Sequence, residues 1–168
     1  MDPLKAASIA GAGTIFAGAT GYGVYKLVED KTLTIQQSRE KGREEKKTSE
    51  SGNSYGAGTW GEQFKDKLMA INAEENKDWW IKKQSEFFGT VSPEKHGTGQ
   101  SATDTTLNFK QLYSDKSTKH STADALKNKC KEVYEMTYTP STDTNKVKEK
   151  EVFKFCSKFE FNEEKQSA

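Results

Sequence analysis

The chain has 168 residues, of which 32% are hydrophobic and 30% charged, and its formal net charge is +1. This length suits one domain with a tail or an anchor, and the low apolar content leaves such a domain only a thin core. The balanced charge argues against a general nucleic-acid binder, which would carry a clear basic excess.

Residues 6–25 form an uncharged run that is rich in glycine and alanine. As a helix this run would be about 30 Å long, close to the thickness of the hydrocarbon core of a bilayer. We therefore expect residues 1–28 to be an N-terminal membrane helix that anchors a single-pass protein, with membrane lipid as its partner. Two alternatives stay open: a signal peptide cleaved near Ala17-Gly18-Ala19, and a buried soluble helix.

Small residues recur at every fourth position of this run, at Gly13, Ala17 and Gly21. Such a row lets two membrane helices approach closely. The row is therefore a candidate packing surface for self-association. Accidental spacing in a segment made largely of glycine and alanine is the alternative explanation.

Residues 29–58 combine a charged stretch of mixed sign with a run rich in serine and glycine. Too few apolar side chains are present to offset the entropy of the chain, and Gly/Ser-rich sequence is typical of flexible linkers. We predict a flexible, charged stalk here. It would connect the anchor to a small helical soluble domain over residues 59–168.

The first part of this domain shows helical periodicity. Thr59 is placed to cap a first helix that carries an apolar stripe. A second apolar stripe runs through residues 80–88. Because the two stripes do not align on one continuous helix, a break is expected within residues 72–78. The composition of residues 89–106 indicates a loop. The first stripe consists of Trp60, Phe64, Leu68 and Ile71.

The C-terminal third predicts a helical hairpin. Ser121 and Asp124 resemble a capping box at the start of a helix over residues 122–137. Residues 146–161 fit either a helix or a strand, and the flanking lysine and glutamate residues favour the helix.

The two cysteines of the chain, Cys130 and Cys156, fall within these last two elements. Leu126, Cys130 and Val133 share one helical face, and Cys156 lies on a similar stripe if the last element is a helix. Both sulfurs would then face the interface of the hairpin, where a disulfide forms if the domain is exported. Reduced and buried thiols are the alternative for a domain that faces the cytoplasm.

Sequence signals for chemistry are weak. The chain has no GxxxxGK[ST] or HExxH motif, and no CxxC or His/Cys cluster surrounds the cysteines. His96 and His120 stand alone in polar stretches, and an apolar helix face does not suit Cys130 as a reactive thiolate. We expect no enzyme activity, no catalytic, cofactor-binding or metal-binding residues, no cofactor and no small-molecule substrate.

The sequence around the cysteines resembles a known pattern. ALKNKCKEVY at residues 125–134 and FKFCS at residues 153–157 are similar to the C-terminal pattern of short paralogous proteins of haemotropic mycoplasmas. Those proteins also begin with a Gly/Ala-rich apolar segment and commonly carry a mid-chain tryptophan, which Trp79 or Trp80 could match. The resemblance covers both ends well and the middle poorly, and the charged stretch of residues 29–50 departs from it. It implies gene duplication, membrane association or export, and a surface or antigenic role, and it supplies no catalytic residues.

Two functions therefore follow from the sequence. The first is a membrane-anchored, surface-exposed interaction or antigenic protein with an extracellular domain, a protein partner or self-association, and no nucleic-acid partner. The second is a cytoplasm-facing accessory protein that binds another bacterial protein. The positive-inside rule favours the second, because more basic residues follow the apolar run than precede it; the signal-like N-terminus, the cysteine pair and the resemblance favour the first. The basic residues that follow the run are Lys26, Lys31, Arg39, Lys41 and Arg43.

Overall fold

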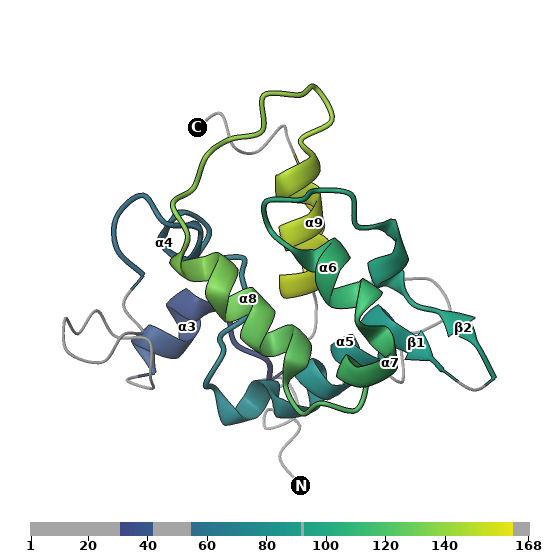
Figure 1. The fold of residues 1–168 in the computed structure, drawn as a ribbon. Coiled ribbons are helices and arrows are strands. Elements are labelled where there is room, and N and C mark those ends of the chain that lie inside the picture. The colour runs from purple at the N-terminus through teal and green to yellow at the C-terminus, as the bar shows by residue number, and fades with distance from the viewer. Residues whose placement is uncertain (1–30, 42–54, 92, 163–168) are drawn as a thin grey trace, which may run out of the picture. The chain divides into compact units, whose positions relative to one another are not determined.

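The computed structural model describes residues 31–41, 55–91 and 93–162. Contacts divide the chain into residues 1–31 and 32–168, and the fold below is that of the second unit. Its described residues are mainly helical, as predicted, with one two-stranded antiparallel sheet (Figure 1). None of the helices in this part of the chain is both long and apolar enough to cross a membrane. The expected anchor and its Gly13, Ala17 and Gly21 row lie outside the described residues.

Short helices separated by turns make up the domain. The first half contains α3 (Ile35–Glu40), α4 (Trp60–Gln63), the 3-10 helix η2 (Glu74–Asn76) and α5 (Lys77–Phe88). The middle contains β1 (Gly89–Thr90), β2 (Lys95–His96), the 3-10 helix η3 (Thr98–Ser101), α6 (Phe109–Ser114) and α7 (Lys116–Lys119). The chain then forms α8 (Ala125–Glu135) and α9 (Val147–Cys156).

The helices α8 and α9 form the predicted hairpin at the centre of the core. Each helix turns one apolar stripe inward, and the buried residues of both stripes belong to a single core cluster. Residues 146–161 are helical up to Cys156, so the helix was the right choice, and Phe159 and Phe161 lie beyond its end. The innermost positions, with no exposed surface, are Leu126, Cys130, Val133, Tyr134, Val152, Phe155 and Cys156.

Aromatic rings fill the space between α5, α6 and α9. The ring centroid of Phe155 lies 5.0 Å from that of Phe87 and 5.0 Å from that of Phe109. All three side chains are fully buried. Burial of one such side chain contributes about 1.5–3 kcal/mol, so a chain poor in apolar residues obtains much of its core from few large rings.

A small backbone layer joins three segments that are distant in sequence. The residue pairs Thr34–Met69 and Leu68–Ser157 form isolated antiparallel bridges. The Met69 N–H donates to the Cys156 carbonyl oxygen at 3.0 Å. The layer therefore connects the N-terminal end of the domain to the end of α9.

Asn76 fixes the first segment of this layer to the rest of the domain. Its Oδ1 accepts a hydrogen bond from the Leu33 N–H at 2.7 Å, and its Nδ2 donates to the carbonyl oxygens of Leu33 and Ala70 at 2.7 and 2.8 Å. The asparagine has no exposed surface. A buried amide with all these partners is stabilising, whereas its removal would leave the Leu33 N–H without its acceptor.

Two parts of the expected stalk, residues 29–58, belong instead to the folded domain. Leu33 and Ile35 are buried, and Thr34 and Gln37 form a capping box at the start of α3. Tyr55, near the end of the expected stalk, is 1% exposed. The prediction underestimated how much of this region is folded, because two apolar residues and a cap are enough to dock a helix of six residues. Residues 42–54 lie outside the described part.

Ion pairs complete the docking of α3. The Arg39 guanidinium lies 2.8 Å from Glu62, which also accepts a hydrogen bond from Lys65 at 2.8 Å. Partial burial alone would raise the pKa of Glu62, but the hydrogen bonds and charges of Lys65 and Arg39 outweigh it, so this pKa is lowered. The carboxylate is thus held ionised between two cations.

The helix ends differ from the predictions at two places. Thr59 caps α4 as expected and accepts a hydrogen bond from the Glu62 N–H, but α4 ends at Gln63. The buried residues Leu68 and Ile71 lie beyond it, Leu68 in the bridge to Ser157. The predicted capping box of Ser121 and Asp124 is wrong. Asp124 adopts a left-handed conformation with φ of 59° and makes no side-chain cap.

Candidate functional site

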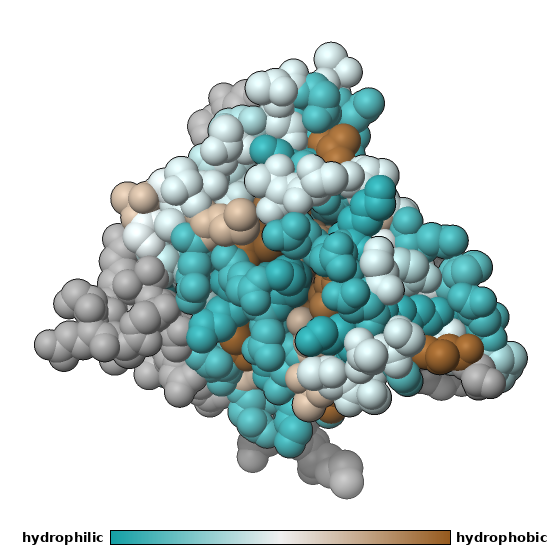
Figure 2. All heavy atoms as spheres, viewed as in Figure 1, coloured by the Kyte–Doolittle hydropathy of each residue, from teal (hydrophilic) through white to brown (hydrophobic). Residues whose placement is uncertain are grey.

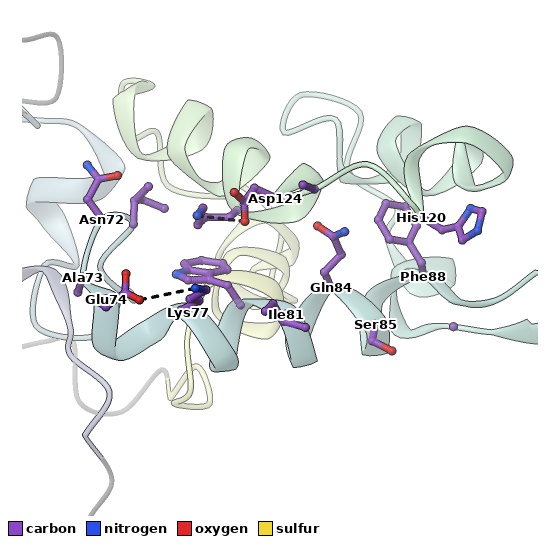
Figure 3. A pocket seen from close by; sticks show the side chains of 15 residues that line it. Asn72, Ala73, Glu74, Lys77, Ile81, Gln84, Ser85, Phe88, His120 and Asp124 are labelled. Atoms are coloured by element: carbon purple, nitrogen blue, oxygen red, sulfur yellow. Dashed lines mark ion pairs between the residues drawn. The ribbon is translucent and has the colours of Figure 1, made fainter.

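A groove of about 680 Å³ lies between α5 and the start of α8 (Figure 3). Figure 3 shows Lys77, Ile81 and Gln84 along α5, with Asp124 on the opposite wall. The chain between α7 and α8 closes one end of the groove near His120. Buried apolar side chains form its floor: Ile71, Trp80 and Phe88.

The register of α5 explains the apolar edge of this groove. Successive residues of a helix are rotated by about 100°, so the residue after the buried Trp80 turns away from the core. That residue is Ile81, which is 60% exposed. It is the most exposed large hydrophobic side chain of the described residues; Val91 and Phe159 are 41% and 39% exposed. In Figure 2 the apolar side chains likewise form small separate areas on a hydrophilic face.

Gln84 connects the two walls. Its Oε1 accepts a hydrogen bond from the Leu126 N–H at 3.1 Å, and its Nε2 donates to the Thr122 carbonyl oxygen at 2.9 Å. The first of these bonds satisfies a backbone donor at the start of α8, where Asp124 provides no side-chain cap. The groove therefore has a defined geometry at its centre.

Charges of both signs line the rim. Glu74 lies 3.7 Å from Lys77 on one wall, and Asp124 lies 3.0 Å from Lys127 on the other (Figure 3). Such exposed pairs contribute little to stability. Because each wall carries one acid and one base, the rim favours neither anionic nor cationic ligands.

The histidines bring no reactive partner to the groove. His120 is exposed, and its Nδ1 lies 2.9 Å from the Lys116 carbonyl oxygen. His96 is exposed in β2, 3.8 Å from Glu94. Within the described ranges no three His, Cys, Asp or Glu side chains are grouped so that they could hold a metal ion. The groove can thus accept an apolar side chain against its floor, with polar groups around it.

Cys130 and Cys156 are brought together as the sequence predicted. Their sulfurs are 2.04 Å apart, and their Cα atoms are 5.7 Å apart. One cysteine comes from the middle of α8 and the other from the last residue of α9, and neither is exposed. With its sulfur in this bond, Cys130 cannot serve as a thiolate nucleophile.

The Trp79–Trp80 pair is divided between two environments. The rings are 4.7 Å apart and nearly perpendicular. Trp80 is buried and donates from Nε1 to the Ala70 carbonyl oxygen at 3.0 Å, whereas Trp79 is partly exposed beneath the Lys83 ammonium. The pair therefore contributes one core residue and one surface residue rather than a flat platform of two rings.

Two glycine patterns near α4 resemble site motifs by spacing alone. Residues 56–61 match GxGxxG, and residues 52–56 match GxSxG, of which Ser54 lies outside the described residues. A dinucleotide site needs a strand before the glycines and a helix after them, but here a turn leads into a helix of four residues. Gly58 has φ of 82° in that turn, and a side chain at Gly61 would collide with the Tyr55 ring. These two glycines serve chain reversal and close packing.

Two buried carboxylates on α9 were not expected from the sequence. Glu149 is 1% exposed and accepts hydrogen bonds from the Ser141 N–H and hydroxyl at 2.8 and 2.6 Å. Glu151 is 6% exposed and accepts from the backbone N–H groups of Thr103 and Asp104. Each carboxylate thus holds a loop against α9.

Burial and the neighbouring Glu149 also shift the pKa of Tyr138. Its hydroxyl donates to Glu149 at 3.3 Å. Burial, followed by the charge and the hydrogen bond of Glu149, raises the pKa of Tyr138 to about 12. The phenol is thereby kept protonated as a donor in this cluster.

Comparisons of the chain with protein-family models, curated proteins and solved structures return no significant match.

Proposed function

We propose that this chain is a membrane-anchored interaction protein whose disulfide-linked helical domain lies on the outer side of the cell membrane. The observation that carries the proposal is the Cys130–Cys156 pair, which joins the two central helices of the domain. Disulfides of this kind persist in oxidising surroundings and are rare in the cytosol. The uncharged run of residues 6–25 supplies the proposed anchor, and the resemblance of both chain ends to paralogous mycoplasma proteins agrees with a surface or antigenic role.

Binding, rather than catalysis, is the proposed role of the domain. The groove beside α5 combines an apolar floor with mixed charges and an exposed Ile81. Such a surface suits a side chain of a protein partner. No arrangement of nucleophile, base and orienting group is found among the described residues that line it.

The proposal is tested on intact cells of the organism. Protease shaving should remove the domain before lysis, and a membrane-impermeant amine reagent should label its lysines. In parallel, alkylation of the denatured but unreduced protein should leave Cys130 and Cys156 unmodified. Survival of the domain until lysis, together with two alkylated cysteines, would overturn the outward topology.

A cytoplasm-facing accessory protein is the alternative. It is favoured by the basic residues that follow the apolar run, such as Lys26 and Arg39. The same experiment separates the two topologies, because a cytoplasmic domain would be protected from shaving and its cysteines would be reduced.

A further inference from the structure

Phe159 is exposed between two lysine side chains just beyond the end of α9. Its side chain is 39% exposed, although most aromatic rings of the described residues pack in the core. The ammonium groups of Lys67 and Lys158 lie 5.3 and 5.5 Å from the centre of its ring. We call Lys67, Lys158 and Phe159 the aromatic–lysine patch.

This patch adjoins the point where the chain enters the domain. The Lys158 ammonium donates to the Thr32 hydroxyl at 3.0 Å. Thr32 is the first residue of the domain. The patch and the N-terminal end of the domain therefore lie on the same face.

The length of the connecting chain limits how far this face can be from a membrane. The proposed membrane segment ends at Tyr25, seven residues before Thr32 (32 − 25 = 7). Even when fully extended, seven residues span only about 25 Å. A domain of this size is roughly 35 Å across, so a tether of this length is too short for Thr32 to lie on the side of the domain farthest from the membrane.

The chemistry of the patch fits the headgroup region of a bilayer. An aromatic ring enters the boundary between headgroups and acyl chains, while lysine stems extend so that their ammonium groups stay near lipid phosphates. Asp66, which lies 3.4 Å from the Lys67 ammonium, offsets part of the positive charge. The ring and the short tether, rather than charge alone, would therefore direct this face to a membrane.

We propose that the aromatic–lysine patch docks on the lipid headgroup surface beside the anchor and so orients the domain on the membrane. This inference rests on the proposed membrane anchor. It adds a second lipid contact, made by the folded domain itself. In this orientation Phe159 inserts into the interface, and Lys67 and Lys158 contact anionic headgroups.

The test uses the full chain reconstituted into phosphatidylcholine vesicles with one quarter phosphatidylglycerol. Phe159→Trp places a fluorescent reporter in the patch, and Val91→Trp is the matched control, because Val91 is 41% exposed in the turn after β1. In Figure 1 the β1–β2 hairpin lies on the opposite side of the view from α3, which follows Thr32 closely. Lipids brominated near the headgroup should quench the added F159W emission, after subtraction of the wild-type signal, and leave V91W emission unquenched.

The lysines are tested in the F159W background. The variant K67Q/K158Q should lower the ratio of docked to free domain by about fivefold for each lysine, and high salt should act in the same direction. Lys116, which lies 5.8 Å from the centre of the Tyr113 ring, supplies the matched control variant K116Q, and this variant should leave the quenching unchanged.

Flotation of the vesicles after an alkaline wash separates the two proposals. Loss of the protein from the vesicles would overturn the anchor and with it the docking. Protein that floats with the vesicles but shows equal quenching of F159W and V91W would overturn the docking face while leaving the anchor in place.

Discussion

Breaking the Cys130–Cys156 bond should destabilise the domain by about 3–4 kcal/mol. The bond closes a loop with a sequence separation of 26, and the chain-entropy model gives about 3.5 kcal/mol for a loop of this length. For a domain of this size, that corresponds to a fall in the thermal midpoint of roughly 12 °C. Because small domains have a net stability of only about 5–15 kcal/mol, reduction should leave a marginal fold.

Thermal unfolding followed by circular dichroism, with and without reductant, measures this difference. The variant C130A/C156A is the control: its midpoint should not respond to reductant. It should lie somewhat below that of the reduced protein, because both sulfur positions are fully buried and their loss leaves unfilled volume. Equal midpoints for the oxidised and reduced protein would refute the argument that loop closure stabilises this domain.

Three further predictions concern single side chains. Asn76→Ala should cost about 2–3 kcal/mol in urea unfolding because it leaves the buried Leu33 N–H without its acceptor, and an effect below about 0.5 kcal/mol would contradict this. Trp80→Ala should lower the free energy of unfolding by about 3–5 kcal/mol. Ile81→Ser, at a position 60% exposed, should change it by no more than about 0.5 kcal/mol. Equal losses for the two variants would disprove the assigned faces of α5. Because its pKa is raised, Tyr138 contributes stability that is complete below pH 10 and lost as the pH rises to about 12. Tyr138→Phe should therefore flatten the pH dependence of stability between these values. An unchanged slope would exclude this assignment.

The sequence was most informative where apolar residues repeat with a helical period. The stripes on α8 and α9 each place a cysteine inward, so the hairpin and its disulfide pairing could be predicted together. A break between the first two stripes was also expected, but the chain leaves the first helix already at Gln63, before the expected position within residues 72–78. The inward placement of both cysteines follows from side-chain spacing, which a sequence displays directly. The choice between a disulfide and reduced thiols depended on the compartment.

Contacts between short, distant segments could not be predicted in this way. The backbone layer uses two or three residues from each segment, and such short runs show no period of two. The buried role of Asn76 could not be predicted either, because its partners are backbone groups of Leu33 and Ala70. Nothing in its sequence neighbourhood distinguishes it from Asn72, which is exposed. The extent of the stalk was misjudged for this reason.

The starts of three helices were hidden by an unusual backbone conformation. Asn108, Asp124 and Lys146 have φ values of 60°, 59° and 50°, and each immediately precedes a helix. Asparagine and aspartate tolerate this left-handed region better than most residues, but sequence rules expect an extended N-cap whose side chain accepts a hydrogen bond. Asp124 fits the side-chain rule and violates the backbone rule, so the capping-box pattern suggested the wrong geometry.

The backbone layer also links the two ends of the domain mechanically. Thr34 pairs with Met69, and the Met69 N–H donates to the carbonyl oxygen of Cys156, the same residue that carries the disulfide. The Tyr134 hydroxyl lies 3.0 Å from the carbonyl oxygens of both Met69 and Cys156. A pull on the N-terminal end of the domain therefore acts through few backbone hydrogen bonds on the covalently joined hairpin. A disulfide at the last residue of α9 therefore stabilises the domain beside the place where its N-terminal segment pairs with the core.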